Sequence, residues 1–339
     1  MKVSFLTASA ALLFGLLPGT VLAQEVTLRI ADQFPLTHLA SKLTIQPFIA
    51  EVEARSDGRI KFEHYPAEQL SKSRGMLDAV RSGVADLALQ VAGQVSDRLP
   101  LSTVVELPSI GADIEQCFTA FQALAQSVLL EREYAPLGVR AIEVNCTPSQ
   151  YMTTSAASID TLDQLRGLKL RAGGSAVELT LKEVGATAVN MSAPDIYMSI
   201  ERGTLDGAIF APASTLGYKL ENIVKGVAKN ISFGSNAAIL FMNERAFQKL
   251  PADLQQIILD VGREVGQDVA EAYNADTERS LGLLAEAGVN VYDLPGPVLE
   301  GVLAAQVKVS EAWVAQMDGR GLAGSATLEA AQAAAGLTN

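Results

Sequence analysis

The sequence contains few of the residues that carry most catalytic and metal chemistry. Only two histidines, two cysteines and one tryptophan occur among its 339 residues. The histidines, His38 and His64, form no spaced cluster with cysteines or carboxylates, so we expect no metal site and no cofactor. A G-x-S-x-G motif and a Walker loop are also missing. We therefore expect the protein not to be an enzyme, although carboxylates from distant segments would escape a motif search.

Basic residues are also scarce. The chain has 26 Lys and Arg against 38 Asp and Glu, which gives a formal net charge of −12. Nucleic acids and anionic membrane surfaces reward clustered positive charge, so this composition argues against both as partners.

Long apolar runs are limited to the first residues, which have the pattern of a secretory signal. Lys2 provides the positive start, Phe5 to Leu17 the apolar core, and Val21-Leu22-Ala23 a small-residue cleavage site. The apolar core is shorter than the roughly 20 residues that a spanning helix needs. We expect cleavage after Ala23 and export of residues 24 onward.

The two cysteines leave two interpretations open. Cys117 lies in a predicted helix over 114–130, and Cys146 follows a predicted strand over 139–145 that runs back toward the helix start. Export permits a disulfide between them. The alternative is two buried free thiols, since cysteine packs as a small core residue. Neither interpretation implies catalysis.

Strands and helices alternate along most of the chain, which is typical of a parallel α/β sheet. Residues 80–88 and 200–208 share one pattern, in which a helix ends at Gly83 or Gly203 and a strand begins at Asp86 or Asp206. The glycine closes the helix in a left-handed conformation, and the aspartate satisfies loop amides. This repetition indicates two similar α/β domains. A long helical pattern over about 250–287 could span both.

The segment from Gly167 to Gly174 carries the most specific signal. Leu168 and Leu170 alternate with Lys169 and Arg171, so one strand face can be buried while the other presents cations. The glycines after Arg171 let the backbone turn close to whatever the guanidinium holds. A guanidinium beside a helix start suits a carboxylate ligand. The alternative is a surface salt bridge.

Several segments together resemble the solute-binding proteins of tripartite ATP-independent periplasmic (TRAP) transporters of the DctP type. They follow the family order over most of residues 26–260, and the Tyr65–Leu70 segment and the Leu-Lys-Leu-Arg strand are the most distinctive. The others are Phe34-Pro35 with His38, Phe48–Val52 with Gly58–Ile60, Val80–Asp86, Leu165–Arg171, Gly185-Ala186, Ile196–Gly207, and Met242-Asn243 with Leu250-Pro251.

The resemblance implies a periplasmic binding protein-like α/β fold, with two domains around a ligand cleft and a long domain-spanning helix. We expect domain I at residues 24–148 and 237–276, domain II at 149–236 and 277–330, and a loose tail at 331–339 within the Ala-rich end. It also implies a periplasmic receptor that captures a small organic acid and delivers it to the membrane permease subunits. We expect this receptor to be a monomer. The family arginine, which grips the ligand carboxylate, falls on Arg171.

Six further residues are candidate ligand contacts, each with a structural alternative. Gln33, Phe34 and His38 follow the first strand, and Gln90 is polar at the end of a buried strand. Tyr151 could donate to a carboxylate or stack on the ligand, and Phe210 could form an apolar wall. The alternatives are helix-start packing for His38 and ordinary core packing for Tyr151 and Phe210.

Departures from the family pattern narrow the expected ligand. Many relatives that bind sialic acid or dicarboxylates carry a second arginine about twenty residues before the first, and that place here is near Tyr151. An apolar run, Ala208 to Pro212, replaces a polar one after Asp206-Gly207. We therefore expect a monocarboxylate with an apolar or aromatic body. An alternative function is ligand sensing, in which the protein docks on a sensor kinase or chemoreceptor.

Overall fold

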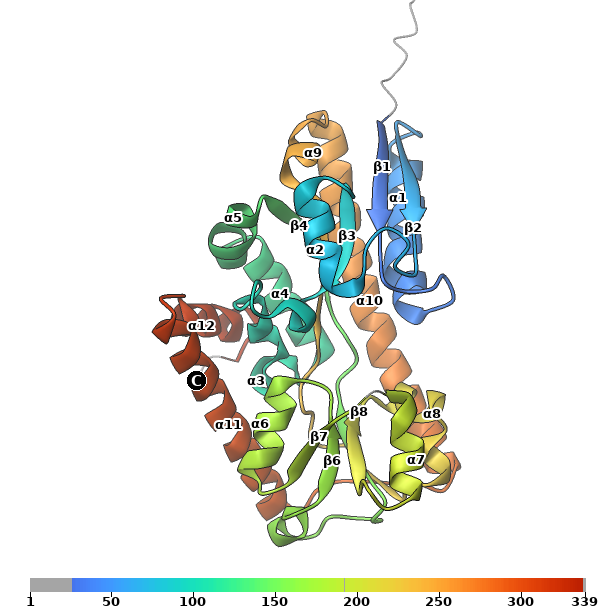
Figure 1. Ribbon diagram of the computed structural model, residues 1–339, viewed down its shortest axis with the longest axis vertical. Coiled ribbons are helices and arrows are strands. Elements are labelled where there is room, and N and C mark those ends of the chain that lie inside the picture. Colours follow the sequence, from blue (N-terminus) through green and yellow to red (C-terminus); the bar gives the residue numbers. More distant parts are fainter. Residues whose placement is uncertain (1–25, 192, 338–339) are drawn as a thin grey trace, which may run out of the picture.

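Two β-sheets, each flanked by helices, form the two halves of the molecule (Figure 1). The structure is a computed structural model that describes residues 26–191 and 193–337. The predicted signal segment with its cleavage site after Ala23, and the last two residues of the predicted tail, lie outside the described residues. We call the half built on the five-stranded sheet domain I and the half built on the six-stranded sheet domain II.

The sheet of domain I has the order β2-β1-β3-β10-β4. Strand β1 is parallel to β2 and β3, whereas β10 is antiparallel to β3 and β4. The strands are β1 (Val26–Ala31), β2 (Ile60–Tyr65), β3 (Leu87–Val91), β4 (Val139–Cys146) and β10 (Ala237–Asn243). The helices that accompany them are α1 (Gln46–Arg55), α2 (Met76–Ser82), α3 (Pro108–Gly111), α4 (Ile114–Ala125), α5 (Ala135–Leu137) and α9 (Glu244–Gln248).

The sheet of domain II has the order β11-β9-β5-β8-β6-β7. Strand β6 is parallel to β7 and β8, and β5 is antiparallel to β8 and β9. The strands are β5 (Tyr151–Thr154), β6 (Lys169–Ala172), β7 (Thr187–Asn190), β8 (Gly207–Phe210), β9 (Gly226–Ala228) and β11 (Asn290–Tyr292). The shorter helices here are α6 (Ser175–Glu183), α7 (Ile196–Glu201) and α8 (Pro212–Gly217). The α/β fold predicted from the sequence is confirmed, but the sheets are not purely parallel, because β10 in domain I and β5 in domain II run antiparallel to their neighbours.

The chain crosses between the sheets twice through extended segments. Residues 147–150 lead from β4 to β5, and residues 229–236 lead from β9 to β10. The two segments are bonded to each other, since Gln150 N donates to Gly234 O and Asn236 N donates to Thr147 Oγ1. Paired crossing segments of this kind allow two domains to turn about one hinge.

The repeated Gly-to-Asp pattern occupies equivalent places in the two domains. Gly83 and Gly203 both adopt a left-handed conformation, with φ of 75° and 70°. The Asp86 carboxylate accepts from Arg29 N of β1, and the Asp206 carboxylate accepts from Lys169 N of β6, both at 2.8 Å. Each aspartate therefore fixes the strand that lies beside its own, which confirms its structural role.

Helix α10 (Ala252–Glu286) is the long helix expected from the sequence. It contacts α1, α4 and β4 of domain I, and α8 and β11 of domain II. Figure 1 shows it running from the top of domain I, beside α9, down to α8. One continuous helix thus packs on both domains.

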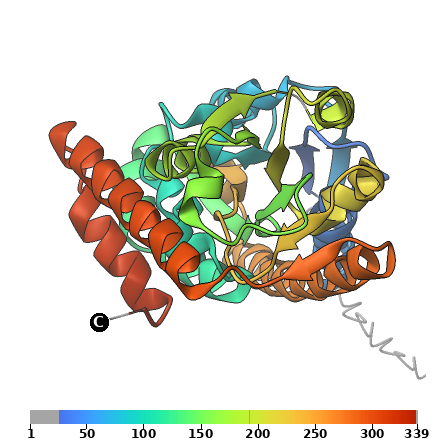
Figure 2. The same ribbon diagram turned by 90° about the horizontal axis from the view of Figure 1, so that it is seen from below.

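Two helices follow along one flank of the molecule, α11 (Gly296–Gly319) and α12 (Gly324–Ala334) (Figure 2). The expectation of a loose tail was wrong for its described part, because α12 packs on α11 and on α4 of domain I. Ala331 within it is fully buried, and Ala335 is 8% exposed. Small alanine side chains let these helices approach closely, which gives tight packing without large apolar residues.

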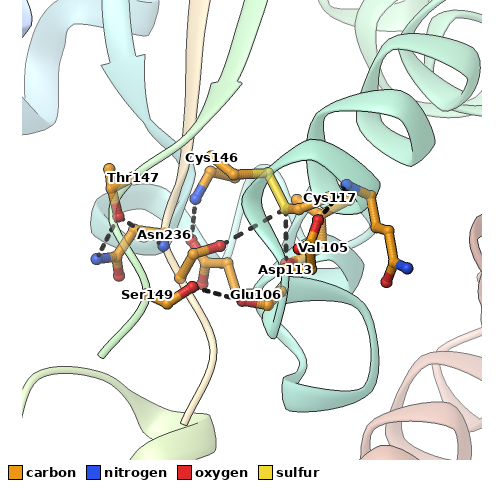
Figure 3. The surroundings of a disulfide bond; sticks show 12 residues. Val105, Glu106, Asp113, Cys117, Cys146, Thr147, Ser149 and Asn236 are labelled. Carbon is orange, nitrogen blue, oxygen red and sulfur yellow. Dashed lines mark hydrogen bonds between the residues drawn. A yellow bond between two sulfur atoms is a disulfide. The ribbon is translucent and has the colours of Figure 1, made fainter. Parts of the chain in front are cut away.

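A disulfide joins Cys117 of α4 to Cys146 at the end of β4, with the Cα atoms 6.2 Å apart (Figure 3). Of the two interpretations that the sequence left open, the disulfide is therefore the correct one, and the two free thiols are not. Thr147 follows Cys146 directly and bonds to Asn236 on the other crossing segment. The disulfide therefore anchors one crossing segment to domain I where it leaves the sheet.

Candidate functional site

A cavity of about 640 Å³ lies between the two domains, beside the crossing segments. Residues of both domains and of α10 line it, and the domain II strands β6 and β8 reach it with their carboxyl ends. That is where ligands bind in open α/β sheets. The lining residues are Phe34, Thr37, His38, Leu39, Ala40, Thr147, Pro148, Gln150, Arg171, Gly173, Phe210, Ala211, Ala213, Ser214, Gly217, Tyr218, Asn236, Tyr273 and Asp276.

Arg171 points into this cavity from the end of β6. Its neighbour Leu170 is fully buried in the domain II core, so strand alternation turns the arginine to the opposite face. The guanidinium carbon lies 5.2 Å from the centroid of the Phe210 ring, and Nε donates to Met191 O at 3.4 Å. The ring and the carbonyl fix the direction of the side chain and leave its terminal nitrogens to the cavity.

The guanidinium has no carboxylate partner among the described residues. The ion pairs of this part of the chain do not include Arg171, and its one hydrogen bond is the weak contact with Met191. Burial lowers the pKa of Arg171, an effect that Tyr218 partly offsets. Arginine nevertheless stays charged at neutral pH. A partly desolvated cation without a counterion favours binding of an anion.

Gly173 makes room for this arrangement. A Cβ atom at this position would lie 2.7 Å from Arg171 Nη1 and 3.2 Å from Gln150 Oε1. Any side chain would therefore displace the guanidinium or the Gln150 amide. The glycine that follows the strand is required by this close approach.

An aromatic pair from domain I forms part of the opposite wall. The rings of Phe34 and His38 stack with centroids 4.4 Å apart and an angle of 17°. Partial burial lowers the pKa of His38, partly offset by the charge of Asp32. Ala40 N donates to His38 Nδ1 at 3.1 Å, so the neutral ring carries its proton on Nε2. His38 therefore presents a flat ring and one N–H donor.

Asp32 and His64 hold the loop that carries this pair. Asp32 is fully buried, and one carboxylate oxygen lies 2.6 Å from His64 Nε2. The other oxygen accepts from Phe34 N at 2.6 Å. His64 had no role in the sequence analysis, and the structure gives it a supporting one.

Phe210 and Tyr218 form the apolar wall on domain II. Their ring centroids are 5.8 Å apart, and the Phe210 ring lies beside the Arg171 guanidinium. Phe210 ends β8, which pairs in parallel with β6. Arg171 pairs with Ala208, and Phe210 lies two residues farther along β8 on the same face. Four of the residues proposed from sequence thus meet in this cavity: Phe34, His38, Arg171 and Phe210.

The structure places two other candidates outside the cavity lining. Gln90 is buried, and its amide accepts from Leu77 N at 3.1 Å and donates to Val91 O at 3.0 Å. These bonds explain a polar residue at the end of a buried strand. Gln33 accepts from Gln94 Nε2 at 3.1 Å. Both amides are used within domain I.

Tyr151 lines a different cavity, of about 330 Å³, together with Asp113, Asn274 and Glu278. Its neighbour Gln150 faces the Arg171 cavity instead, because successive residues of an extended chain point in opposite directions. Gln150 is 7% exposed, and its side-chain amide has no hydrogen-bond partner among the described residues.

Asn236, Tyr273, Asp276 and Tyr218 were also missed. Asn236 lies on the second crossing segment, and Tyr273 and Asp276 lie one helical turn apart on α10. Asp276 is paired with Arg279. Burial, with the charges of Glu143 and Asp276, raises the pKa of Tyr273 above its usual value, so its phenol stays protonated. No pattern in the sequence marks these positions, which only the fold brings together.

Arg171 is the one permanently charged cation among the described lining residues. Over residues 26–191 and 193–337, no three His, Cys, Asp or Glu side chains are placed to hold a metal ion. The site as built can bind a single anionic group against an otherwise apolar and hydrogen-bonding surface.

Comparison with known proteins identifies the family. The model of the bacterial extracellular solute-binding protein family 7, DctP, matches residues 32–316. The chain belongs to this family. A solute-binding protein of Albidiferax ferrireducens is 27% identical over 282 residues, which cover 80% of this chain and 82% of that protein. The resemblance read from the sequence is confirmed.

Solved structures agree with this assignment. A marine metagenome TRAP solute-binding protein specific for aromatic acids, in complex with meta-hydroxyphenylacetate, has a TM-score of 0.78 at 24% identity, covering 92% of this chain and 99% of that one. A TRAP periplasmic protein of Bordetella bronchiseptica with bound (R)- and (S)-mandelate has a TM-score of 0.76 at 22% identity, with the same coverage. At these identities the likeness establishes the two-domain fold.

Family membership makes the protein an extracytoplasmic solute-binding receptor of the TRAP type. Such receptors bind small organic acids and work with membrane permease subunits. Of the helices in the described part of the chain, none has the length and apolar character to cross a membrane.

Proposed function

We propose that this protein captures a small monocarboxylate with an apolar or aromatic body, and delivers it to a TRAP permease from the periplasm. The ligand carboxylate binds the Arg171 guanidinium, and the body lies against Phe210, Phe34 and His38. The observation that carries this proposal is the partly buried guanidinium of Arg171, which has no carboxylate partner among the described residues. A carboxylate matches the fork of its terminal nitrogens.

Three features support an apolar acid over a dicarboxylate or sugar acid. The cavity offers one permanent cation, so a second carboxylate would lie without a partner. Rings from both domains face the same space, and they suit a flat or apolar body. The related structures hold hydroxyphenylacetate and mandelate, which are aromatic monocarboxylates.

We further propose that the domains close over the ligand about the crossing segments, residues 147–150 and 229–236. Domain I then comprises 24–148 and 237–276 together with α12, which packs on α4. Leu39 of domain I and Tyr218 of domain II line the cavity and are each 40% exposed. Closure would remove this apolar surface from water, which favours the closed form only when a ligand neutralises Arg171.

Thermal denaturation with a panel of acids tests the proposal. Benzoate, mandelate, pyruvate, succinate and sialic acid are added to the mature protein, its Arg171→Ala variant and its Arg166→Ala variant. Arg166 is a matched control, because it precedes the same strand and pairs with Asp163 on the surface at 3.0 Å. A bound ligand raises the unfolding temperature by mass action.

We expect an aromatic or keto monocarboxylate to stabilise the wild type and the Arg166→Ala variant. In the Arg171→Ala variant the affinity, measured by calorimetry, should fall about a hundredfold or more. Preference for succinate or sialic acid over the monocarboxylates would contradict the proposed ligand class. An Arg171→Ala variant that binds as well as wild type would contradict the proposed site.

A further inference from the structure

A second cavity, of about 520 Å³, shares two lining residues, Gly173 and Asn236, with the Arg171 cavity. It lies between the chain that follows β3, residues 91–106, and the end of α11. Because Gly173 and Asn236 line both spaces, a ligand bound at this junction lies beside both of them. We call the second space the Glu106 cavity.

The two cavities differ in chemistry. Apolar and aromatic side chains surround Arg171, whereas polar side chains predominate in the Glu106 cavity. These include Gln94, Ser96, Thr103 and Gln316, and the lining also holds two charged side chains, Glu106 and Arg320. Trp313 also lines this space, and its Nε1 donates to Thr103 Oγ1 at 2.9 Å. A polar chamber of this kind suits a hydrogen-bonding group better than a hydrocarbon.

Glu106 has acceptor capacity left for such a group. Its Oε1 accepts from Ala237 N at 3.1 Å, and both carboxylate oxygens lie close to Gly93, 3.2 and 3.3 Å from where a Cβ would stand. It forms no ion pair with any described residue. A carboxylate accepts about four hydrogen bonds. Burial raises the pKa of Glu106 to about 7, although the N–H groups of Ala237 and Gly93 oppose the shift.

Arg171 lies close to Gly173, one of the two residues that the cavities share. Its Nη1 lies 2.7 Å from the position of a Cβ on Gly173, and Gly173 borders both cavities. A carboxylate held by the guanidinium therefore sits at the junction. Its substituents can reach the rings on one side and the polar chamber on the other.

We propose that the Glu106 cavity receives a hydroxyl or N–H group of the same acid whose carboxylate binds Arg171, and that Glu106 accepts a hydrogen bond from it. This inference rests on the proposed function and narrows the ligand to carboxylic acids that carry a hydrogen-bond donor. Glu106 thus selects the donor, whereas Arg171 selects the acid.

Calorimetry with acids that differ by one hydroxyl tests this inference. Benzoate is compared with 3-hydroxybenzoate, and phenylacetate with mandelate, on the wild type and on Glu106→Gln and Glu106→Leu variants. We expect the wild type to bind at least one hydroxylated acid about tenfold more tightly than its partner. Glu106→Leu, which has no acceptor, should lose this gain, and Glu106→Gln, which keeps one neutral acceptor oxygen, should lose part of it.

Glu133→Gln is the control variant. Glu133 is a buried carboxylate of domain I that lines neither cavity, and burial also raises its pKa to about 7. The Glu133→Gln variant should still bind the hydroxylated acid more tightly than its unhydroxylated partner. Two results would overturn this inference and leave the proposed function standing. One is tighter binding of the hydroxylated acid that persists in both Glu106 variants. The other is a wild type that binds through Arg171 but shows no preference for the hydroxylated acid. Binding that is absent, or independent of Arg171, would overturn both the inference and the proposed function.

Discussion

Strands β1 and β6 occupy equivalent places in the two domains. They differ at the last residue that pairs with the neighbouring strand, β3 in domain I and β8 in domain II. Ile30 of β1 pairs with Leu87, and Leu170 of β6 pairs with Gly207. The next residue is Ala31 in domain I and Arg171 in domain II, and each pairs with an alanine. Ala31 is fully buried, whereas Arg171 faces the cavity. One architecture thus supports a core position in one domain and a cation in the other.

The two domains also differ in whether the charged residue at this place has a partner. In domain I, Asp32 follows Ala31 at once and is satisfied by His64 and by Phe34 N. In domain II, Arg171 has no carboxylate partner among the described residues. A buried charge that is fully paired fixes local structure, whereas one left without a counterion favours a ligand that supplies it. The paired Asp32 therefore supports the local structure, whereas the unpaired Arg171 is suited to bind a ligand.

Exchanging the two residues should produce the largest effect. Ala31→Arg places a charge in a closed core, so we expect the free energy of unfolding to fall by about 3 kcal/mol or more. Arg171→Ala removes a partly desolvated cation, so stability should stay within about 0.5 kcal/mol of wild type or rise. Denaturant unfolding of both variants without ligand measures this. Equal destabilisation by the two changes would show that Arg171 is a packing residue.

Removing the equivalent aspartates should have a smaller effect. Asp206→Ala loses the acceptor for Lys169 N, and we expect a cost of about 1–2 kcal/mol. Asp86→Ala should cost more, because Asp86 also accepts from the Arg29 side chain, with Nε at 3.1 Å. The same unfolding experiment measures both. A larger cost at Asp206 than at Asp86 would break the proposed equivalence.

The smallest effect concerns pH. Glu143 of β4 is fully buried, and one of its oxygens has no hydrogen-bond partner, so burial raises its pKa to about 8. Between about pH 5 and pH 8 the native protein keeps a proton that the unfolded chain has released, so stability falls as pH rises. We expect Glu143→Gln to flatten this dependence by up to about 1 kcal/mol per pH unit. An unchanged slope in the variant would assign the titration to other groups.

The sequence predicted features that depend on local chemistry. Gly83 and Gly203 end helices, Asp86 and Asp206 fix neighbouring strands, and Leu170 beside Arg171 sets which face is buried. Each follows from a few adjacent residues, and the structure agrees with each. The repeated Gly-to-Asp pattern indicated two similar domains, and the family resemblance added the expectation of a ligand cleft between them.

The remaining features depend on contacts between distant segments. Gln150, Asn236 and Tyr273 meet in the cavity because the crossing segments and α10 pass beside β6. Gln90 was expected to contact the ligand, yet its side-chain oxygen accepts a hydrogen bond from the backbone N–H of Leu77, thirteen residues earlier. Residues 331–339 were expected to form a loose tail, yet α12, which includes the first of them, packs on α4 and α11. Packing of this kind is decided by the shape of the partner surface rather than by the segment itself.

A crystal structure of the protein grown with benzoate, or with mandelate if that binds more tightly, tests the central claim most directly. We predict both carboxylate oxygens within hydrogen-bond distance of the Arg171 guanidinium, at about 2.7–2.9 Å, and the ring between Phe210 and the Phe34–His38 pair. An acid bound in the cleft with its carboxylate on other groups, and Arg171 left without it, would contradict the account.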